Sequence, residues 1–317
     1  MRFLGVDAGG TKTRVALCDE SGKILSKVLG GPGNHLDIGI DKLKNTLQDC
    51  LNQIDENIAE VDLCILGLSG AGFSQKSCDR LRDLMRPIIP SKELIVVNDC
   101  VIALKGALGT SRKSGAIVVA GTGSMVIGVD VNGNFHRTGG WGHIIGDPWS
   151  AYGLALDSIK EVMKYWEGRG KPTSLVYHLE KAFDLHSIDD VLRYFYVEKH
   201  PKGHVASFAP FVLRSAEEGD EVAQMVVKRC IAELVDSVKP ILKRVGSDFL
   251  SYTGGLFNNS YFLRTVKISL QDVNVNLTEP SLPPLGGALL MAMEQFFTVT
   301  EEIEENLKRQ LSEESAH

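Results

Sequence analysis

The sequence predicts an α/β protein of two domains, and a duplicated loop is the main reason. Residues 7–13 read Asp-Ala-Gly-Gly-Thr-Lys-Thr directly after an apolar run, and residues 120–124 read Ala-Gly-Thr-Gly-Ser after another. Each loop leads into a second apolar segment and an acidic glycine turn, and the spacing from Thr11 to Gly22 equals that from Thr122 to Gly133. A repeated strand, glycine loop and strand indicates two facing domains that hold phosphates between them.

The first half of the chain predicts the order strand, strand, strand, helix, strand, helix, strand. Apolar runs between turn residues predict the strands, and leucines and isoleucines three or four positions apart predict the first helix. The expected strands cover residues 3–7, 13–18, 23–28, 61–68 and 94–97, and the expected helices cover 41–58 and a segment that ends near residue 85. The order restarts near residue 115, after a small and polar junction, so we expect domains at residues 1–110 and 111–317.

The second half predicts longer helices. The expected helices cover residues 149–166, 173–183, 187–198, 204–246 and 260–271 and one that starts near residue 285, and the expected strands cover 249–253 and 273–277. The acidic tail at 301–315 predicts a helix with a solvated face. The pattern leaves open whether this helix packs on the first domain.

Composition places the chain among ordinary globular proteins. It has 317 residues, of which 44% are hydrophobic and 23% charged, and a formal net charge of -6 with no long basic run, which argues against nucleic-acid binding. No apolar stretch reaches the ~20 residues of a membrane span, and no secretory leader is visible. The six cysteines form no C-x-x-C pair, so we expect free thiols and a cytoplasmic protein.

The first loop has the features of a phosphate and metal site. Gly9 and Gly10 allow the backbone to turn tightly, and successive N–H groups there can form an anion nest. Thr11 and Thr13 add hydroxyl donors, and Asp7 at the strand end can hold Mg²⁺ beside bound phosphates. The alternative is a glycine-rich hairpin turn that Asp7 caps. The second loop, with Gly121, Thr122 and Gly123, has the same two interpretations.

Asp99 is the candidate general base. It follows the apolar run 94–97, and a carboxylate at the end of a strand can accept a hydroxyl proton. The alternative is structural, because Asn98 or Asp99 can cap a helix that starts near Cys100.

The segment 139–147 indicates a sugar site. Four glycines surround Trp141 and an aspartate, Asp147, ends the run, so an aromatic ring and a carboxylate lie on a permissive backbone. The alternative is a bulged strand and turn with Trp141 in the core. Asn34 lies in a loop that could reach a ligand, and Gly254-Gly255 could let a nucleotide lie against the backbone or form a strand-to-helix turn.

In this order, these segments resemble the N-acetylglucosamine kinases. The matching residues are 7–13, Asn98-Asp99, 121–124, Gly140-Trp-Gly-His-Ile-Ile-Gly-Asp147 and Gly254-Gly255. Those kinases belong to the BadF/BadG/BcrA/BcrD-type ATPase branch of the actin/Hsp70/sugar-kinase superfamily. The resemblance covers nearly the whole chain, and the Gly-Trp-Gly-His segment is its most specific part.

The resemblance implies a fold, an activity and a homodimer. The fold would be two ribonuclease-H-like (actin-like ATPase) domains, each a mixed sheet flanked by helices, around a central cleft. The activity would be transfer of a phosphoryl group from ATP, with Mg²⁺, to the 6-hydroxyl of N-acetylglucosamine, with Asp99 as the base and Asp7 as the residue that organises the metal.

The resemblance also assigns the binding residues. Nucleotide contacts would come from Gly9, Gly10, Thr11, Lys12, Thr13, Gly121, Thr122 and Gly123, and the adenosine would lie near Gly254 and Gly255. Sugar contacts would come from Asn34, Asp99, Gly140, Trp141, Gly142 and Asp147.

The sequence departs from the kinase pattern directly after Asp147, where it reads Pro148-Trp149-Ser150. Trp149 could narrow the sugar site or offer a stacking face to a different amino sugar. Glucosamine, N-acetylmannosamine, glucose and N-acetylmuramic acid are therefore alternative substrates. Another alternative is an ATPase activator with an iron–sulfur cluster, but the cysteine spacing offers no ligand set for one. A sugar-sensing regulator is a further alternative, although no helix-turn-helix precedes the first strand.

Overall fold

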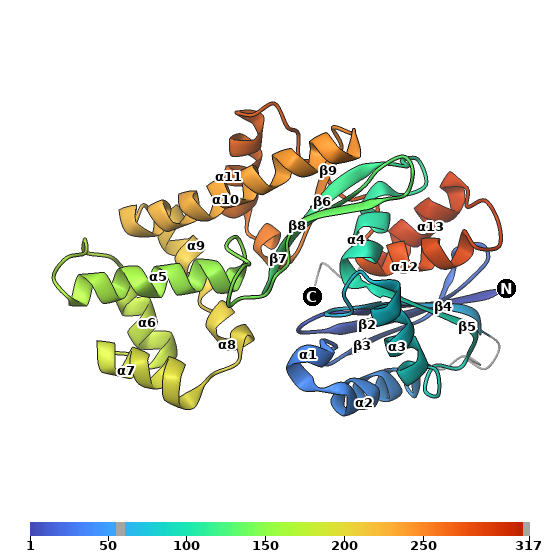
Figure 1. Cartoon of the computed structure of the whole chain (residues 1–317), viewed down its shortest axis with the longest axis horizontal. Coiled ribbons are helices and arrows are strands. Elements are labelled where there is room, and N and C mark those ends of the chain that lie inside the picture. The colour runs from blue at the N-terminus through green and yellow to red at the C-terminus, as the bar shows by residue number, and fades with distance from the viewer. Residues whose placement is uncertain (55–60, 313–317) are drawn as a thin grey trace. The chain divides into compact units, whose positions relative to one another are not determined.

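The computed structural model describes residues 1–54 and 61–312 in two compact units. The first unit comprises Met1–Lys113 and the C-terminal segment from Glu279, and the second comprises Ser114–Thr278 (Figure 1). The first unit is therefore discontinuous in sequence, whereas the sequence analysis drew a single boundary after residue 110. Parts of two expected helices, residues 55–58 and 313–315, lie outside the described residues.

The first unit is built on a five-stranded mixed sheet in the order β3-β2-β1-β4-β5. Its strands are β1 (Arg2–Ala8), β2 (Thr13–Asp19), β3 (Ile24–Gly30), β4 (Val61–Leu68) and β5 (Ser91–Asn98). The first three strands pair antiparallel, and β4 and β5 continue the sheet parallel to β1. The central strands β1 and β4 are buried along almost their whole length, which fits a sheet that is covered on both faces.

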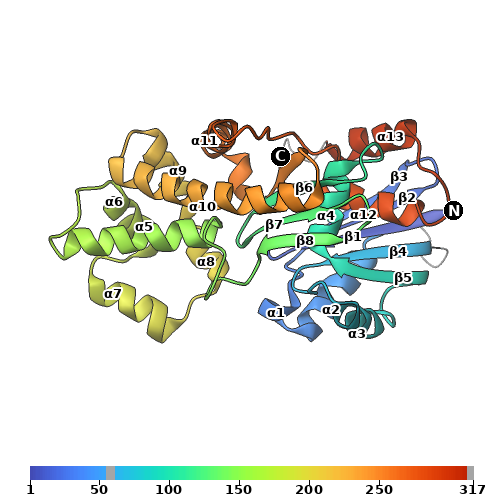
Figure 2. The same cartoon turned by 45° about the horizontal axis from the view of Figure 1, so that its top comes forward.

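Helices cover both faces of this sheet (Figures 1 and 2). They are α1 (His35–Ile38), α2 (Ile40–Leu51), α3 (Gln75–Met85), α4 (Asp99–Leu108), α12 (Pro284–Met293) and α13 (Glu301–Ser312). One face packs on α2 and α3 through leucines at helical spacing, such as Leu43 and Leu47. The other packs on α4, α12 and α13. The helices α4 and α12 cross closely, because a side chain at Gly287 would lie 1.9 Å from the Ile102 carbonyl oxygen.

The C-terminal helix belongs to the core of the first unit. Leu307 is fully buried and Leu311 nearly so, one turn apart, so the helix packs on the first unit through one face and is solvated on the other. Its acidic residue Glu304 is also buried, and its Oε2 accepts hydrogen bonds from the Thr110 backbone N–H at 2.8 Å and the Thr110 hydroxyl at 2.5 Å. The other oxygen accepts from the Ser281 hydroxyl. The Glu304 carboxylate thus joins the segment by which the chain leaves this unit, at Thr110, to the segment by which it returns, at Ser281.

The second unit contains a four-stranded sheet in the order β8-β7-β6-β9. Its strands are β6 (Gly115–Ala120), β7 (Ser124–Val129), β8 (Phe135–Gly139) and β9 (Leu250–Thr253), and β9 pairs parallel to β6. This order repeats that of β3-β2-β1-β4 in the first unit. The predicted strand at 273–277 is wrong: only a single bridge forms, between Leu250 and Leu277, where the first unit has its fifth strand.

Helices fill the rest of the second unit. They are α5 (Ala151–Trp166), α6 (Leu175–Phe183), α7 (Ile188–Leu192), α8 (Lys202–Ala206), α9 (Ala209–Glu217), α10 (Glu221–Val245) and α11 (Ser260–Gln271). The helical stretch predicted at 204–246 is divided into three helices, α8, α9 and α10. Gly219 adopts φ +100° after α9, and the Asp220 carboxylate then caps α10 by accepting from the N–H groups of Val222 and Ala223.

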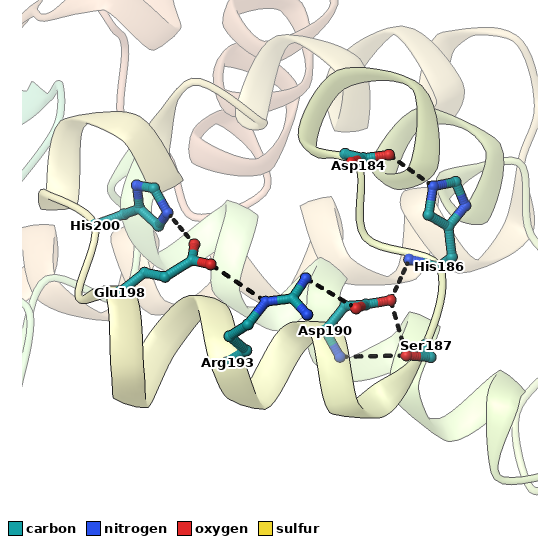
Figure 3. A network of polar contacts seen from close by, with 7 residues as sticks. All are labelled: Asp184, His186, Ser187, Asp190, Arg193, Glu198 and His200. Atoms are coloured by element: carbon teal, nitrogen blue, oxygen red, sulfur yellow. Dashed lines mark hydrogen bonds and ion pairs between the residues drawn. The ribbon is translucent and has the colours of Figure 1, made fainter.

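The segment predicted as one helix at 187–198 changes from α-helical to π-helical geometry at Arg193. Figure 3 shows the polar contacts that accompany this change, which involve Asp184, His186, Ser187, Asp190, Arg193, Glu198 and His200. The Tyr194 hydroxyl lies 2.5 Å from His204 Nδ1 and so links this segment to α8.

The described residues contain no helix that is long and apolar enough to cross a membrane. All six cysteines are free thiols, and five of them are buried.

Candidate active site

The first glycine loop is a closed hairpin at the end of β1. The Gly9 N–H donates to the Lys12 carbonyl at 2.9 Å, and the Gly33 N–H donates to the Gly9 carbonyl at 2.8 Å. Thr11 and Lys12 are exposed, and a side chain added at Gly10 would meet no atom within 4 Å. The top of the loop therefore presents its backbone and the polar side chains of Thr11 and Lys12 to open space, as an anion site requires.

Thr13 lies beneath this loop and not on its surface. It is fully buried, and its Oγ1 has no hydrogen-bond partner among the described residues. Gly33 packs so closely here that an added Cβ would lie 2.7 Å from the Ala8 Cβ and 2.8 Å from Thr13 Oγ1. In this conformation Thr13 Oγ1 is covered by the loop, and the expected contact of Thr13 with phosphate stays a prediction.

Asp7 is a buried carboxylate at the end of β1. It is 7% exposed, and burial raises its pKa to about 7, with a further rise from the neighbouring charge of Asp99. The guanidinium of Arg14 opposes this rise, and its Nη1 lies 3.4 Å from Asp7 Oδ2. The structure thus gathers two carboxylates and one arginine on one side of the first loop.

Asp99 occupies the first position of α4. The capping role that the sequence left open belongs to Asn98, whose side chain accepts from the Cys100 N–H at 3.0 Å. Burial raises the pKa of Asp99, against hydrogen bonds from Cys100 and Ser69 that lower it. A half-buried carboxylate with a raised pKa has the affinity for protons that a general base needs.

Asn34 is the N-cap of α1. Its Oδ1 accepts from the Leu36 N–H at 3.1 Å, and its Nδ2 donates to Asp37 at 2.6 Å. The side chain is 6% exposed and packs against Gly70, where an added Cβ would lie 2.8 Å from Oδ1. Asn34 therefore has a structural role in addition to the ligand contact expected of it.

The second loop repeats the first in the second unit. The Gly121 N–H donates to the Gly123 carbonyl at 3.0 Å, and the Ala151 N–H donates to the Gly121 carbonyl at 2.8 Å. Ser124 takes the place of Thr13: it is 3% exposed, and its Oγ also has no partner among the described residues.

Asp147 lies beside this second loop. It is a non-glycine residue at φ +59°, it is 7% exposed, and its Oδ1 is buried without a partner in the described part of the chain. An added Cβ at Gly123 would lie 2.9 Å from its Oδ2. Burial raises the pKa of Asp147, and the Ser124 N–H and the positive charge of Lys202 oppose this rise. Backbone strain and an unsatisfied buried oxygen together are typical of a ligand-binding residue.

Trp141 is exposed, which favours the interpretation as a binding residue over that as a core residue. Its side chain is 57% exposed, and the Arg137 guanidinium lies 4.0 Å from its ring centroid. Gly139, Gly140 and Gly142 all adopt φ between +71° and +83°, so the backbone around the ring depends on glycine.

Trp149 is a core residue, so its expected part in the sugar site is wrong. It is 2% exposed, and its ring contacts the backbone at Gly139, where an added Cβ would lie 2.8 Å from Cη2. The large apolar ring is stabilised by burial under β8 and α5. Ser150 then caps α5 by accepting from the Gly153 N–H.

Gly254 joins β9 to the second loop. It adopts φ +109°, and an added Cβ would lie 2.4 Å from the Ala120 carbonyl oxygen. An added side chain at Gly255 would meet nothing within 4 Å. The expected nucleotide residues of this unit therefore lie together at the ends of β6 and β9.

Sequence reasoning missed the charged residues that support these sites, chiefly Arg14, Arg137 and Lys202. Arg14 was detectable, because the hairpin that the first loop predicts places it opposite Asp7. Lys202 was not, because it reaches Asp147 only through the packing of α8 on α5.

Comparisons with known proteins identify the family. The chain is 31% identical over 268 residues to an N-acetylmuramic acid/N-acetylglucosamine kinase of Clostridium acetobutylicum, which covers 82% of this chain and 87% of the relative. It is 26% identical over 312 residues to the N-acetyl-D-glucosamine kinase of Dictyostelium discoideum, with 92% and 97% covered.

A solved structure supports the fold. A provisionally named N-acetylglucosamine kinase from Chromobacterium violaceum superimposes with a TM-score of 0.75 at 24% identity, over 92% of this chain and 98% of that one. The predicted fold class is thereby confirmed, and the relatives confirm the prediction of an enzyme of the kinase class. The model of the BadF/BadG/BcrA/BcrD ATPase family matches residues 4–292, and the chain belongs to this family.

Proposed function

We propose that the protein phosphorylates the 6-hydroxyl of N-acetylglucosamine, or of a close amino-sugar relative, with ATP as the donor. The observation that carries this proposal is the pair of carboxylates Asp7 and Asp99 beside an open glycine loop. The names of two relatives, which are kinases for N-acetylglucosamine, support the choice of substrate.

The nucleotide would be held by backbone N–H groups of the two loops and by Thr11, Lys12 and Thr122. Gly254 and Gly255 would leave room for the adenosine. Thr13 is omitted from these direct contacts because it is fully buried.

Asp7 is the residue that would hold Mg²⁺, directly or through water. The described residues contain no cluster of three or more His, Cys, Asp or Glu side chains that could bind a metal. The donor set nevertheless fits, because Mg²⁺ is typically bound by one or two carboxylates together with substrate phosphates. When bound, it would neutralise phosphate charge.

The sugar would be oriented by Asn34, Asp147 and the exposed ring of Trp141, with backbone contacts from Gly140 and Gly142. Asp147 Oδ1 offers a buried acceptor that a sugar hydroxyl would satisfy. Asp99 would accept the proton of the 6-hydroxyl as that oxygen attacks the γ-phosphorus of ATP. ADP and the sugar 6-phosphate would be the products.

The first test is ADP release from Mg·ATP, with and without each sugar of a panel. The panel contains N-acetylglucosamine, glucosamine, N-acetylmannosamine, glucose and N-acetylmuramic acid. We expect strong stimulation by N-acetylglucosamine and none by its 6-deoxy analogue. Hydrolysis that no sugar changes would contradict the proposal and favour an ATPase of another kind.

Asp99→Asn tests the base. We expect turnover to fall on the order of 100- to 10,000-fold, because general-base catalysis typically contributes that much. Sugar binding, measured by calorimetry, should stay within a few-fold of the wild type, and Asp49→Asn, at an exposed position of α2, is the surface control. Near wild-type turnover would eliminate Asp99 as the base.

A carboxylate-bearing amino sugar is the second candidate substrate. Lys202 lies within electrostatic reach of Asp147, and Arg137 stacks on Trp141, so two cations border the expected sugar site. One relative is named for N-acetylmuramic acid as well as N-acetylglucosamine. Comparing N-acetylmuramic acid with its methyl ester separates the charge of the substituent from its size. Equal rates for acid and ester would argue against recognition of the carboxylate.

The homodimer that the resemblance implies remains a prediction. Sedimentation equilibrium of the full chain measures it directly.

A further inference from the structure

Arg14 is the side chain that lies opposite Asp7 in the hairpin of β1 and β2. The two residues are direct partners in the antiparallel register, so their side chains project from the same face of the sheet. The ion pair between Arg14 Nη1 and Asp7 Oδ2, at 3.4 Å, joins the two strands next to the first glycine loop. No motif of the sequence analysis assigned a role to Arg14.

The surroundings of Arg14 combine a buried carboxylate with a second group of the same charge. Asp7 is 7% exposed, and the side chain of Arg14 is 38% exposed, so the pair lies at the boundary between core and surface. Asp99 adds a second carboxylate on this side of the loop. The two carboxylates and a bound polyphosphate all carry negative charge, so they would repel one another unless positive charge lies close to them.

The length of the Arg14–Asp7 contact matters for its role. A full charge-assisted hydrogen bond between arginine and a carboxylate measures about 2.7–2.9 Å. The separation here is 3.4 Å, so Arg14 and Asp7 form a long hydrogen bond that is weaker than a full charge-assisted one. Such a contact orients the carboxylate and still lets a metal ion take the oxygen.

We propose that Arg14 is a positioning residue for the metal-bound phosphates: it orients Asp7 before Mg·ATP binds and then provides positive charge beside the phosphates. The proposal rests on the proposed function, because it takes Asp7 as the residue that holds Mg²⁺. It differs from the role of Lys12, which lies exposed in the loop itself and can contact phosphate without touching Asp7.

The test compares Arg14→Ala and Arg14→Lys with the wild type in two assays. The first is turnover as a function of Mg²⁺ at saturating ATP and sugar. The second is the rise in melting temperature caused by ADP with Mg²⁺, relative to ADP with EDTA, which requires no catalysis. Arg82→Ala, in a surface ion pair of α3 with Asp79, is the matched control.

For Arg14→Ala we expect the Mg²⁺ concentration for half-maximal turnover to rise about tenfold, because residues that orient a metal ligand typically change metal affinity 10- to 100-fold. The Mg²⁺-dependent part of the melting shift should shrink, and the KM for the sugar should stay within about twofold. Arg14→Lys should restore most of the metal dependence, because it keeps the charge.

An unchanged Mg²⁺ dependence in both assays would overturn the proposal, and so would an equal effect of Arg82→Ala. If Arg14→Ala does not fold, Arg14→Lys and Arg14→Gln carry the same comparison, since only the lysine keeps the charge. A wild-type protein that no sugar stimulates would instead contradict the proposed function. The melting shift with Mg·ADP would then still decide the role of Arg14.

Discussion

The two glycine loops have the same backbone design and different charges. In each loop, the N–H of the first glycine donates a hydrogen bond to a carbonyl within the loop. The carbonyl of that glycine accepts a 2.8 Å hydrogen bond from the N–H of a distant residue, Gly33 in one unit and Ala151 in the other. In each, the first residue after the loop, Thr13 or Ser124, carries a buried hydroxyl without a described partner.

The difference lies in where the carboxylate comes from. Asp7 precedes the first loop on its own strand, whereas Val119 holds the corresponding position before the second. The second loop receives its carboxylate from Asp147, which approaches Gly123 from a separate segment. The comparison teaches that a duplicated backbone can be kept while the charged residues around the two copies diverge. Under the proposed function, the first copy would serve the metal and the second the sugar.

The largest expected effect tests this division directly. We expect Asp7→Asn to lower turnover on the order of 1,000-fold, because it removes the carboxylate that would hold Mg²⁺ beside the phosphates. Asp147→Asn should chiefly raise the KM for the sugar. Kinetics at varied Mg²⁺ and sugar concentrations measure both. Equal changes of Mg²⁺ dependence in the two variants would show that the loops are not specialised.

The next effect concerns pH. Because the pKa of Asp7 is about 7 in the folded protein and 3.8 when unperturbed, the folded state binds more protons between these pH values. The free energy of unfolding from this group is therefore highest near pH 4 and falls as pH rises to about 7. Asp7→Asn should gain stability over the wild type across this range, measured by urea unfolding with EDTA present. A constant difference between the two proteins would contradict the raised pKa.

The glycines that support each loop should differ in tolerance. Gly254→Ala combines φ +109° with a Cβ 2.4 Å from a backbone oxygen, so we expect a loss of about 3 kcal/mol. Gly10→Ala, with no atom within 4 Å, should change stability by less than about 0.5 kcal/mol. All three tryptophans lie in the second unit, so their fluorescence follows the unfolding of that unit alone, while circular dichroism follows both. A wild-type-like Gly254→Ala would refute the close packing at β9.

The smallest effect should be shared by both loops. Thr13→Val and Ser124→Ala each remove a buried hydroxyl that has no partner, so the protein without nucleotide should gain up to about 1 kcal/mol. Thermal unfolding of both variants measures this. A loss of stability in one variant only would reveal a hidden partner, and hence a structural difference between the loops.

Local patterns predicted most of the strands and both loops, because apolar runs and glycine turns encode them within a few residues. The first loop, the end of β1 and the start of α4 all lie where the sequence placed them. Trp149 could not be assigned in this way, since its burial depends on the segment at Gly139 and on α5. The strand expected at 273–277 failed for a similar reason, because only Leu277 reaches β9.

Some errors were avoidable. Gly219 and Asp220 are a helix stop and a helix cap in adjacent positions, and they divide the long helix that periodicity alone predicted. The buried stripe of α13 was also visible as leucines four residues apart. The role of a single charged residue such as Arg14 depends on the register between β1 and β2. That register follows from the length of the loop only after the hairpin has been recognised.

The return of α12 and α13 to the first unit has a consequence for protein synthesis. One apolar face of the first sheet is covered in large part by α12 and α13, which follow the entire second unit in the chain. On the ribosome, the second unit is contiguous and can fold as soon as it emerges, whereas the first sheet must wait for α12 with a hydrophobic face uncovered. The protein is thus expected to depend on chaperones most strongly at its N-terminal part, although that part is made first.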